Sequence, residues 1–199
     1  MKKVISHQIL RAALDVFTTE GFAGTTAQIA HAAGVGTGTL FRYFPTKAGL
    51  TAALFQEVEQ GLENRLVPGL PHSTPPAWLT HASQGRLWQY WMQAAQQALT
   101  YPAAFQYWVL YRADPRGAVV RTHAANRVGW LARVAHALTE YQDWGQPDPA
   151  RQALAVAQFA GQWEATLHYL LTRPPLPTAE PAPAVLERAF RSWWRGLDL

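Results

Sequence analysis

The chain of 199 residues contains no cysteine, so it has no disulfide framework and no thiolate for catalysis or metal binding. It also lacks any run of about 20 apolar residues that could cross a bilayer, and any N-terminal apolar run typical of a signal peptide. No segment shows the alternating pattern of a β-strand, and no internal repeat is present. These absences predict an all-α, cytosolic protein without a membrane partner.

The sequence also lacks the short motifs that mark common enzyme sites. It has no Gly-x-Ser-x-Gly nucleophile elbow, no glycine-rich phosphate loop and no His-Glu-x-x-His zinc motif. Glu164 and His168 lie one helical turn apart and could share a metal ion, but no second Glu-x-x-His accompanies them. A hydrogen bond within a helical bundle is the better interpretation of this pair. We expect no metal, no cofactor and no enzymatic activity.

Tryptophan is absent before Trp78, and all nine tryptophans lie at or after that position. The breaker-rich segment 68–76 directly precedes this change in composition. The sequence therefore predicts two domains. The first covers residues 1–50 and continues as a connecting helix to about residue 66, and the second, helical domain covers residues 77–199.

Charge is distributed unevenly along the chain. Residues 1–50 hold five basic and two acidic residues, a net charge of +3, whereas the whole chain carries +4. Most of the positive excess therefore lies in the predicted first domain. This distribution suits a polyanionic partner.

Within this basic segment, two short helical patterns flank a glycine. The first begins with Thr25 and Gln28 at the spacing of a capping box, in which each side chain binds a free amide group of the other residue. Gly34 follows the last apolar position of this helix, and glycine tolerates the left-handed conformation that a helix exit often requires. The pattern indicates a helix, a tight turn and a second helix.

The second helix is expected to run from about Thr37 to Phe44, with Leu40 and Phe44 facing the core at i and i+4. Gly36, Thr37, a further glycine and Thr39 form its entrance and first turn. These small residues would let the backbone approach base edges, and the threonines offer hydroxyl and methyl groups for base contacts. The pair of helices predicts a helix-turn-helix, which places its second helix in the DNA major groove.

This segment resembles the TetR family of transcriptional regulators. The family's run Gly-Val-small-x-Gly-Thr-Leu-aromatic-x-aromatic/His-Phe-x-Ser/Thr-Lys-x-x-Leu corresponds here to residues 34–50, and the match extends over residues 5–55. The resemblance implies base contacts from Gly36, Thr37 and Thr39, and phosphate contacts from Thr26, Tyr43 and Lys47. Beyond residue 60 the resemblance is one of length and helical character.

The chain departs from the family at Phe41, where many members have a tyrosine whose hydroxyl binds the DNA backbone. That hydrogen bond is unavailable to phenylalanine, so we expect Phe41 only to pack. Arg42 follows directly and could compensate by binding a phosphate or a base.

The resemblance implies an effector pocket in the middle helices of the second domain, where this chain is rich in aromatic residues. Residues 77–139 contain six arginines and one acidic residue, Asp114, which favours a small lipophilic effector with an anionic head over a lipophilic cation. The alternative is that these aromatics are ordinary core residues. The candidate ligand-binding residues are Trp88, Trp91, Phe105, Trp108, Tyr111, Arg112 and Trp130.

The two last long helices pair into a four-helix dimer bundle in the TetR family. Ala157, Gly161 and Ala165 put small residues on one face of the expected helix 150–171, which makes that face a candidate dimer seam; close packing within one subunit is the alternative. Trp193 and Trp194 are adjacent, so we expect one of them to cover a partner subunit or the neighbouring helix. The candidate interface residues of the last helix are Phe190, Trp193 and Trp194.

The resemblance and the residues together predict a ligand-responsive transcriptional regulator, most simply a repressor. It would bind a palindromic double-stranded DNA operator as a homodimer and be released by its effector. The competing interpretations are an all-helical enzyme and a helical adaptor without a DNA role. Neither is supported by a motif in the chain.

Overall fold

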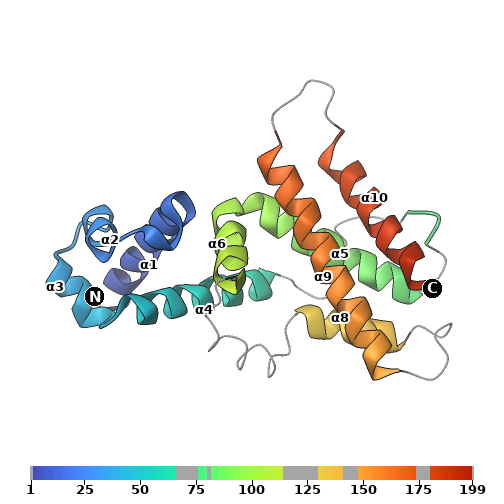
Figure 1. The fold of residues 1–199 in the computed structure, drawn as a ribbon, viewed down its shortest axis with the longest axis horizontal. Helices are drawn as coiled ribbons and strands as arrows, with labels where there is room; N and C mark the ends of the chain where they lie inside the picture. Colours follow the sequence, from blue (N-terminus) through green and yellow to red (C-terminus); the bar gives the residue numbers. More distant parts are fainter. Residues whose placement is uncertain are drawn as a thin grey trace. The chain divides into compact units, whose positions relative to one another are not determined.

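The computed structural model describes residues 2–65, 76–79, 82–113, 130–140, 148–173 and 180–198. Every regular element in these ranges is a helix, which confirms the predicted all-α class (Figure 1). None of the described helices is long and apolar enough to span a membrane. The elements are α1 (Lys2–Glu20), η1 (Gly21–Ala23), α2 (Thr26–Ala32), α3 (Thr37–Tyr43), α4 (Lys47–Arg65), α5 (Ala82–Thr100), α6 (Pro102–Ala113), α8 (Trp130–Thr139), α9 (Pro149–Thr172), α10 (Ala182–Arg195) and η4 (Gly196–Asp198).

The chain divides into two compact units. The first unit comprises Met1–Leu62 and Tyr101–His123, and the second comprises Glu63–Thr100 and Ala124–Leu199. The segment that contains α6 therefore groups with the N-terminal helices, although we expected it in the second domain. Helix α8 begins at Trp130, and residues 114–129 lie outside the described residues.

The helix-turn-helix is set by local hydrogen bonds that the sequence predicts. Thr25 Oγ1 accepts the Gln28 amide N–H at 3.2 Å, and Gln28 Oε1 accepts the Thr25 amide N–H at 2.7 Å, which completes the capping box of α2. Gly34 adopts a φ of +64° after α2. The Gly34 N–H donates to the His31 carbonyl and the Val35 N–H to the Ala30 carbonyl, each at 3.0 Å. This pair of bonds is a Schellman motif, which ends α2 and turns the chain into α3.

The core of the first unit joins α1 and α4 to α6 through aromatic rings. The Tyr107 ring stacks on the Phe17 ring with centroids 5.9 Å apart, and the Tyr111 ring stacks on the Phe55 ring at 4.4 Å. The Tyr107 hydroxyl donates to the Thr51 carbonyl at 2.8 Å. Burial of these rings is the physical reason that α6 belongs to the N-terminal unit, because each large aromatic side chain contributes substantial apolar area.

The second unit is built around Phe190 of α10, whose side chain is fully buried. The Trp91 ring of α5 meets the Phe190 ring edge-on at 5.6 Å and the Phe159 ring of α9 at 5.2 Å. α9 and α10 run side by side in this unit (Figure 1). Asp148 caps α9 by accepting the Ala150 N–H at 2.9 Å, with Pro149 at the first helical position, where its missing N–H costs nothing.

Candidate functional site

The outer face of α3 is formed by residues that the fold does not use. Thr37, Gly38, Phe41 and Arg42 are exposed, whereas Leu40 is fully buried against the rest of the first unit. Gly36 is exposed as well and lies directly before the helix as its N-cap. Small and polar groups therefore surround the N-terminal end of α3, which is the end that contacts base edges in a helix-turn-helix.

The remaining predicted contact residues flank this face and are partly buried. Thr26 lies at the start of α2, Thr39 on the side of α3, and Tyr43 at its last position, each with an intermediate exposure. The guanidinium carbon of Arg42 lies 5.7 Å from the centroid of the Tyr43 ring. The structure thus groups the predicted DNA contacts around α3 and the first turn of α2.

Lys47 has a structural partner that the sequence did not reveal. Its ammonium donates to the Phe22 carbonyl at 2.7 Å and lies 5.8 Å from the centroid of the Phe17 ring. An ammonium group has three N–H donors, so two remain for the phosphate contact that the resemblance implies. Lys47 therefore connects the first turn of α4 to η1 in addition to its predicted DNA role.

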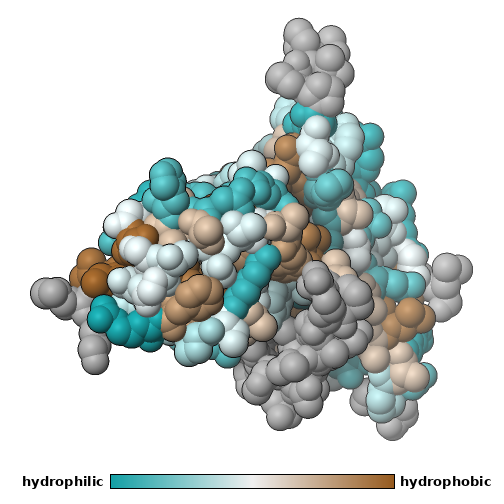
Figure 2. Space-filling view, turned by 60° about the vertical axis from the view of Figure 1, so that its left-hand side comes forward, coloured by the Kyte–Doolittle hydropathy of each residue, from teal (hydrophilic) through white to brown (hydrophobic). Residues whose placement is uncertain are grey.

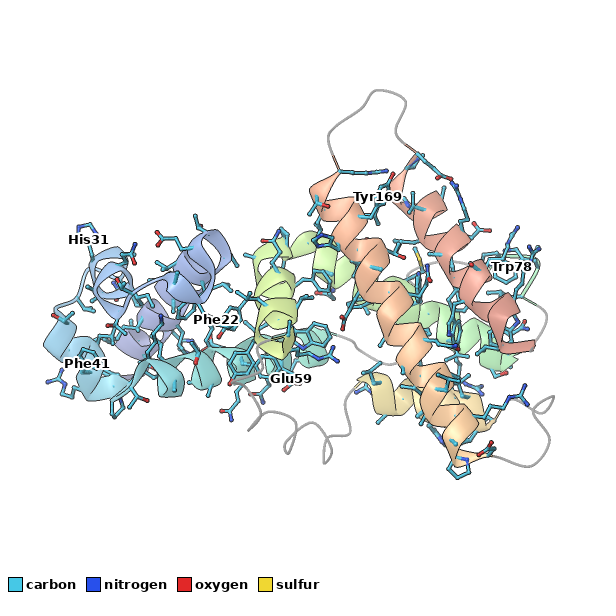
Figure 3. The ribbon with its side chains drawn as sticks, viewed as in Figure 1. Phe22, His31, Phe41, Glu59, Trp78 and Tyr169 are labelled. Atoms are coloured by element: carbon cyan, nitrogen blue, oxygen red, sulfur yellow. The ribbon has the colours of Figure 1, made fainter. Side chains whose placement is uncertain are left out.

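Phe41 is the residue of this surface whose exposure differs from the expectation. We expected the ring to pack, but 43 % of the residue is exposed. Figure 3 shows it at the outer edge of the first unit, on α3. The helical spacing could have predicted this exposure. Leu40 and Phe44 define the inward face of α3, and Phe41 lies outside the apolar stripe that they form.

The effector candidates are divided between the two units. Trp88 and Trp91 belong to the second unit, whereas Phe105, Trp108, Tyr111 and Arg112 belong to the first. All of these aromatic residues are buried, so they are core residues of their own units. The side chain of Trp130 lies outside the described residues.

Arg112, the charged residue among the effector candidates, differs in its surroundings from Arg86 of α5. Arg112 is exposed, and its guanidinium carbon lies 4.3 Å from the centroid of the Trp108 ring. Arg86 forms an ion pair with Glu140. The described residues contain no group of three or more histidine, aspartate or glutamate side chains that could hold a metal ion.

The dimer candidates also separate into two sets. Ala157, Gly161 and Ala165 are all exposed on α9, and a Cβ atom added to Gly161 would meet nothing within 4 Å. Trp193 and Trp194, in contrast, are only 5 % and 7 % exposed. Together with Phe190 they are core residues of one subunit, which corrects the expectation that one of the tryptophans covers a partner. The neighbouring-helix alternative is the one that the structure shows, because the Trp193 ring packs edge-on against the Phe159 ring of α9 at 4.8 Å.

Comparison with known proteins agrees with this geometry. Residues 9–54 match the model of the bacterial regulatory proteins of the tetR family. A protein from Shewanella sp. PV-4 assigned to the tetR family of transcription regulators is 28 % identical, with a TM-score of 0.74 over 96 % of this chain and 97 % of that one. A TetR-like transcriptional regulator from Rhodococcus sp. RHA1 is 23 % identical, with a TM-score of 0.70 over 98 % of this chain and 96 % of that one.

The fatty acid degradation regulator FadR from Bacillus halodurans has the same fold at 18 % identity, with a TM-score of 0.69 over 94 % of this chain and 93 % of that one. Fold and site together define a helix-turn-helix DNA-binding protein with a helical second unit. Residues 9–54 thus carry the N-terminal domain of the tetR family of bacterial regulatory proteins, and the chain as a whole is similar in fold to solved regulators of that family.

Proposed function

We propose that this regulator is a repressor that binds a palindromic operator as a homodimer and leaves it when a small lipophilic effector binds. The outer face of α3 carries the proposal, because Gly36, Thr37 and Arg42 are exposed there and have no role in the core. Each subunit would contact one half-site, with the two α3 helices about 34 Å apart, one turn of DNA. The protein would act in the cytoplasm, where bacterial operators lie.

The outward face of α9 supports a homodimer. Leu154 and Tyr169 are 59 % and 53 % exposed there, on either side of the small residues Ala157, Gly161 and Ala165. Large exposed side chains next to small ones allow two helices to approach closely and interdigitate. A second copy of the same helix would cover this apolar surface and give the twofold symmetry that a palindrome requires.

Gly161→Leu tests the dimer directly. In a single subunit the leucine meets open space, so the fold should persist. Between two helices it would force the backbones apart, and overpacking of this kind costs about 1–3 kcal/mol. Sedimentation should show monomers and operator binding should fall, while Ala132→Leu, at an exposed alanine of α8, should leave the dimer intact. A Gly161→Leu variant that is still dimeric would place the seam elsewhere.

Two observations support a lipophilic effector that carries an acceptor or an anionic head. Trp91 is fully buried, and its indole N–H has no hydrogen-bond acceptor among the described residues. A buried donor without an acceptor costs about 1–3 kcal/mol, so a ligand oxygen bound there would recover that energy. Arg112 is exposed beside Trp108 and could hold a carboxylate or phosphate in a two-bond geometry that lysine cannot reproduce.

The effector proposal is tested by a release assay on the protein–operator complex. Long-chain fatty acids, acyl thioesters and aromatic acids should release the protein, and lipophilic cations should not. Arg112→Ala and Trp91→Phe are separate tests, one in each unit. The variant that blunts release without changing the DNA affinity of the free protein marks the unit that binds the effector. Release by cations alone would reject the charge argument, and normal release of the Arg112→Ala variant would move the anionic anchor to another arginine.

A gel shift with the DNA upstream of the protein's own gene tests the proposal as a whole. Specific binding that competitor DNA does not remove supports an operator, and a reporter under that promoter distinguishes repression from activation. A helical adaptor without a DNA role remains the alternative, and it would bind neither this DNA nor any sequence enriched from a random library.

A further inference from the structure

Phe41 exposes an aromatic ring on the face of α3 that the proposed function assigns to DNA. It follows Thr37 by four positions and Gly38 by three, so all three residues lie on the same exposed side of the helix. Arg42, the next residue, is exposed and positively charged. The ring therefore lies where DNA would cover it, on the helix face between a residue with base-contacting groups and a cation suited to a phosphate. Figure 3 shows Phe41 at the outer edge of the first unit.

Phenylalanine cannot bind a phosphate through a hydrogen bond, because its ring has neither donor nor acceptor. The major groove offers one apolar group for such a ring, the C5-methyl group of thymine, which distinguishes an A·T pair from the other pairs. Gly38 contributes no side chain beside the ring, and a Cβ atom at Gly38 would have nothing within 4 Å. The ring edge is thus accessible from the side on which a base would approach.

The hydropathy of the molecular surface is consistent with a local contact. In the face shown in Figure 2, hydrophobic residues are interspersed with hydrophilic ones. In the described part of the first unit, the large hydrophobic residues with high exposure are Val4 on α1, Phe41 on α3 and Tyr101 before α6. Phe41 is the one on the helix that would enter the groove, so a single methyl contact fits it better than an extended protein interface.

We propose that Phe41 recognises a thymine C5-methyl group in each operator half-site, and that this contact helps to set which sequence the protein binds. The proposal rests on the proposed operator binding. It goes beyond that function by assigning one base identity to one side chain. The contact replaces water around both apolar groups, which is the source of its free energy.

The experiment uses DNA in which single methyl groups are removed. The full-length chain first selects its site from a random duplex library, and the selected duplex is resynthesised with deoxyuridine in place of one thymine at a time. Deoxyuridine pairs like thymine and lacks only the C5-methyl group. At one symmetric pair of positions, the dissociation constant of the wild-type protein should rise about fourfold for one half-site and about 15-fold for both, from the burial of one methyl group each.

Substitution at Phe41 shows whether the side chain causes this sensitivity. Phe41→Ala should bind the thymine and uridine duplexes with equal affinity, whereas Phe41→Leu, which keeps an apolar side chain, should retain part of the difference. Thr37→Ala is the matched control on the same face and should preserve the full uridine effect at the Phe41 position. The uridine arm with wild-type protein needs no variant, so it is independent of any effect of Phe41→Ala on folding.

Each alternative outcome has one meaning. If no thymine position is sensitive, or if the selected site contains no thymine, the inference is wrong while operator binding stands. If Phe41→Ala keeps the same sensitivity as wild type, another residue contacts the methyl group and the inference is again wrong. If the library yields no enriched sequence, the proposed function itself fails.

Discussion

Lys47 allows one substitution to test a structural role and a DNA-binding role separately. Its ammonium donates to the Phe22 carbonyl at 2.7 Å, and the residue is half-buried. Lys47→Met keeps most of the apolar stem and removes the charge and all three N–H donors. The variant should therefore lose the bond to η1 without opening a large cavity.

The expected loss of stability is about 1–2 kcal/mol, the low end of the effect of hydrogen bonds to charged groups, because water competes for a half-buried ammonium. With a urea m-value of about 2 kcal/mol/M, the unfolding midpoint should fall by about 0.5–1 M, measured by circular dichroism. If Lys47 also binds a phosphate, the slope of log affinity against log salt should fall by about 0.9 in magnitude for each subunit, measured by fluorescence anisotropy. Affinity for operator and for random DNA should fall by similar factors, because a phosphate carries no base identity.

Arg42→Gln is the matched control because Arg42 is exposed on α3 and its guanidinium lies beside the Tyr43 ring, where no buried group depends on it. Its stability should stay within about 0.5 kcal/mol of wild type, while its salt dependence should change as that of Lys47→Met does. An unchanged unfolding midpoint for Lys47→Met would refute the bond to Phe22. An unchanged salt slope would refute the phosphate contact and leave Lys47 as a residue of the fold alone.

Three further predictions concern stability and are measured by urea unfolding. Gly34→Ala should lower the free energy of unfolding by about 1–2 kcal/mol, because φ is +64° there and a Cβ atom disfavours the left-handed region even without a clash. Gly38→Ala, within helix α3, should raise it by up to about 1 kcal/mol, and equal effects of the two substitutions would contradict the Schellman turn. Thr25→Ala should cost about 1 kcal/mol as a lost N-cap, and Thr19→Ala, on exposed helix surface, should cost less than half of that. Burial, and to a lesser extent the nearby Tyr111, holds the pKa of Tyr107 above its ordinary value of about 10, so the folded state keeps a proton that the unfolded state releases. Stability should therefore fall as pH rises above about 10, and Tyr107→Phe should remove this part of the alkaline loss; an identical pH profile would show that Tyr107 does not titrate in this way.

The sequence by itself determined the helix-turn-helix, because the signals that form it act over a few residues. The Thr25–Gln28 capping box and the left-handed Gly34 are both present as predicted, and both depend on backbone groups within one helical turn. The bounds of α3, α4 and α9 also follow from local residues, namely small residues at the start of α3, Thr46 before α4 and the Asp148–Pro149 pair before α9. A cap satisfies free amide groups of its own helix, so it needs no information about the rest of the fold.

Only the tertiary structure decided which buried side chains meet across distant elements. The sequence could not show that Tyr107 and Tyr111 pack with Phe17 and Phe55 in the first unit, or that Phe190 places Trp193 and Trp194 in the core of a single subunit. It likewise hid the bond from Lys47 to the Phe22 carbonyl. Hydrophobic burial is non-directional, so the periodicity of apolar residues indicates that a residue is buried but does not identify the residues that it contacts. Those contacts depend on how helices far apart in the chain fit together.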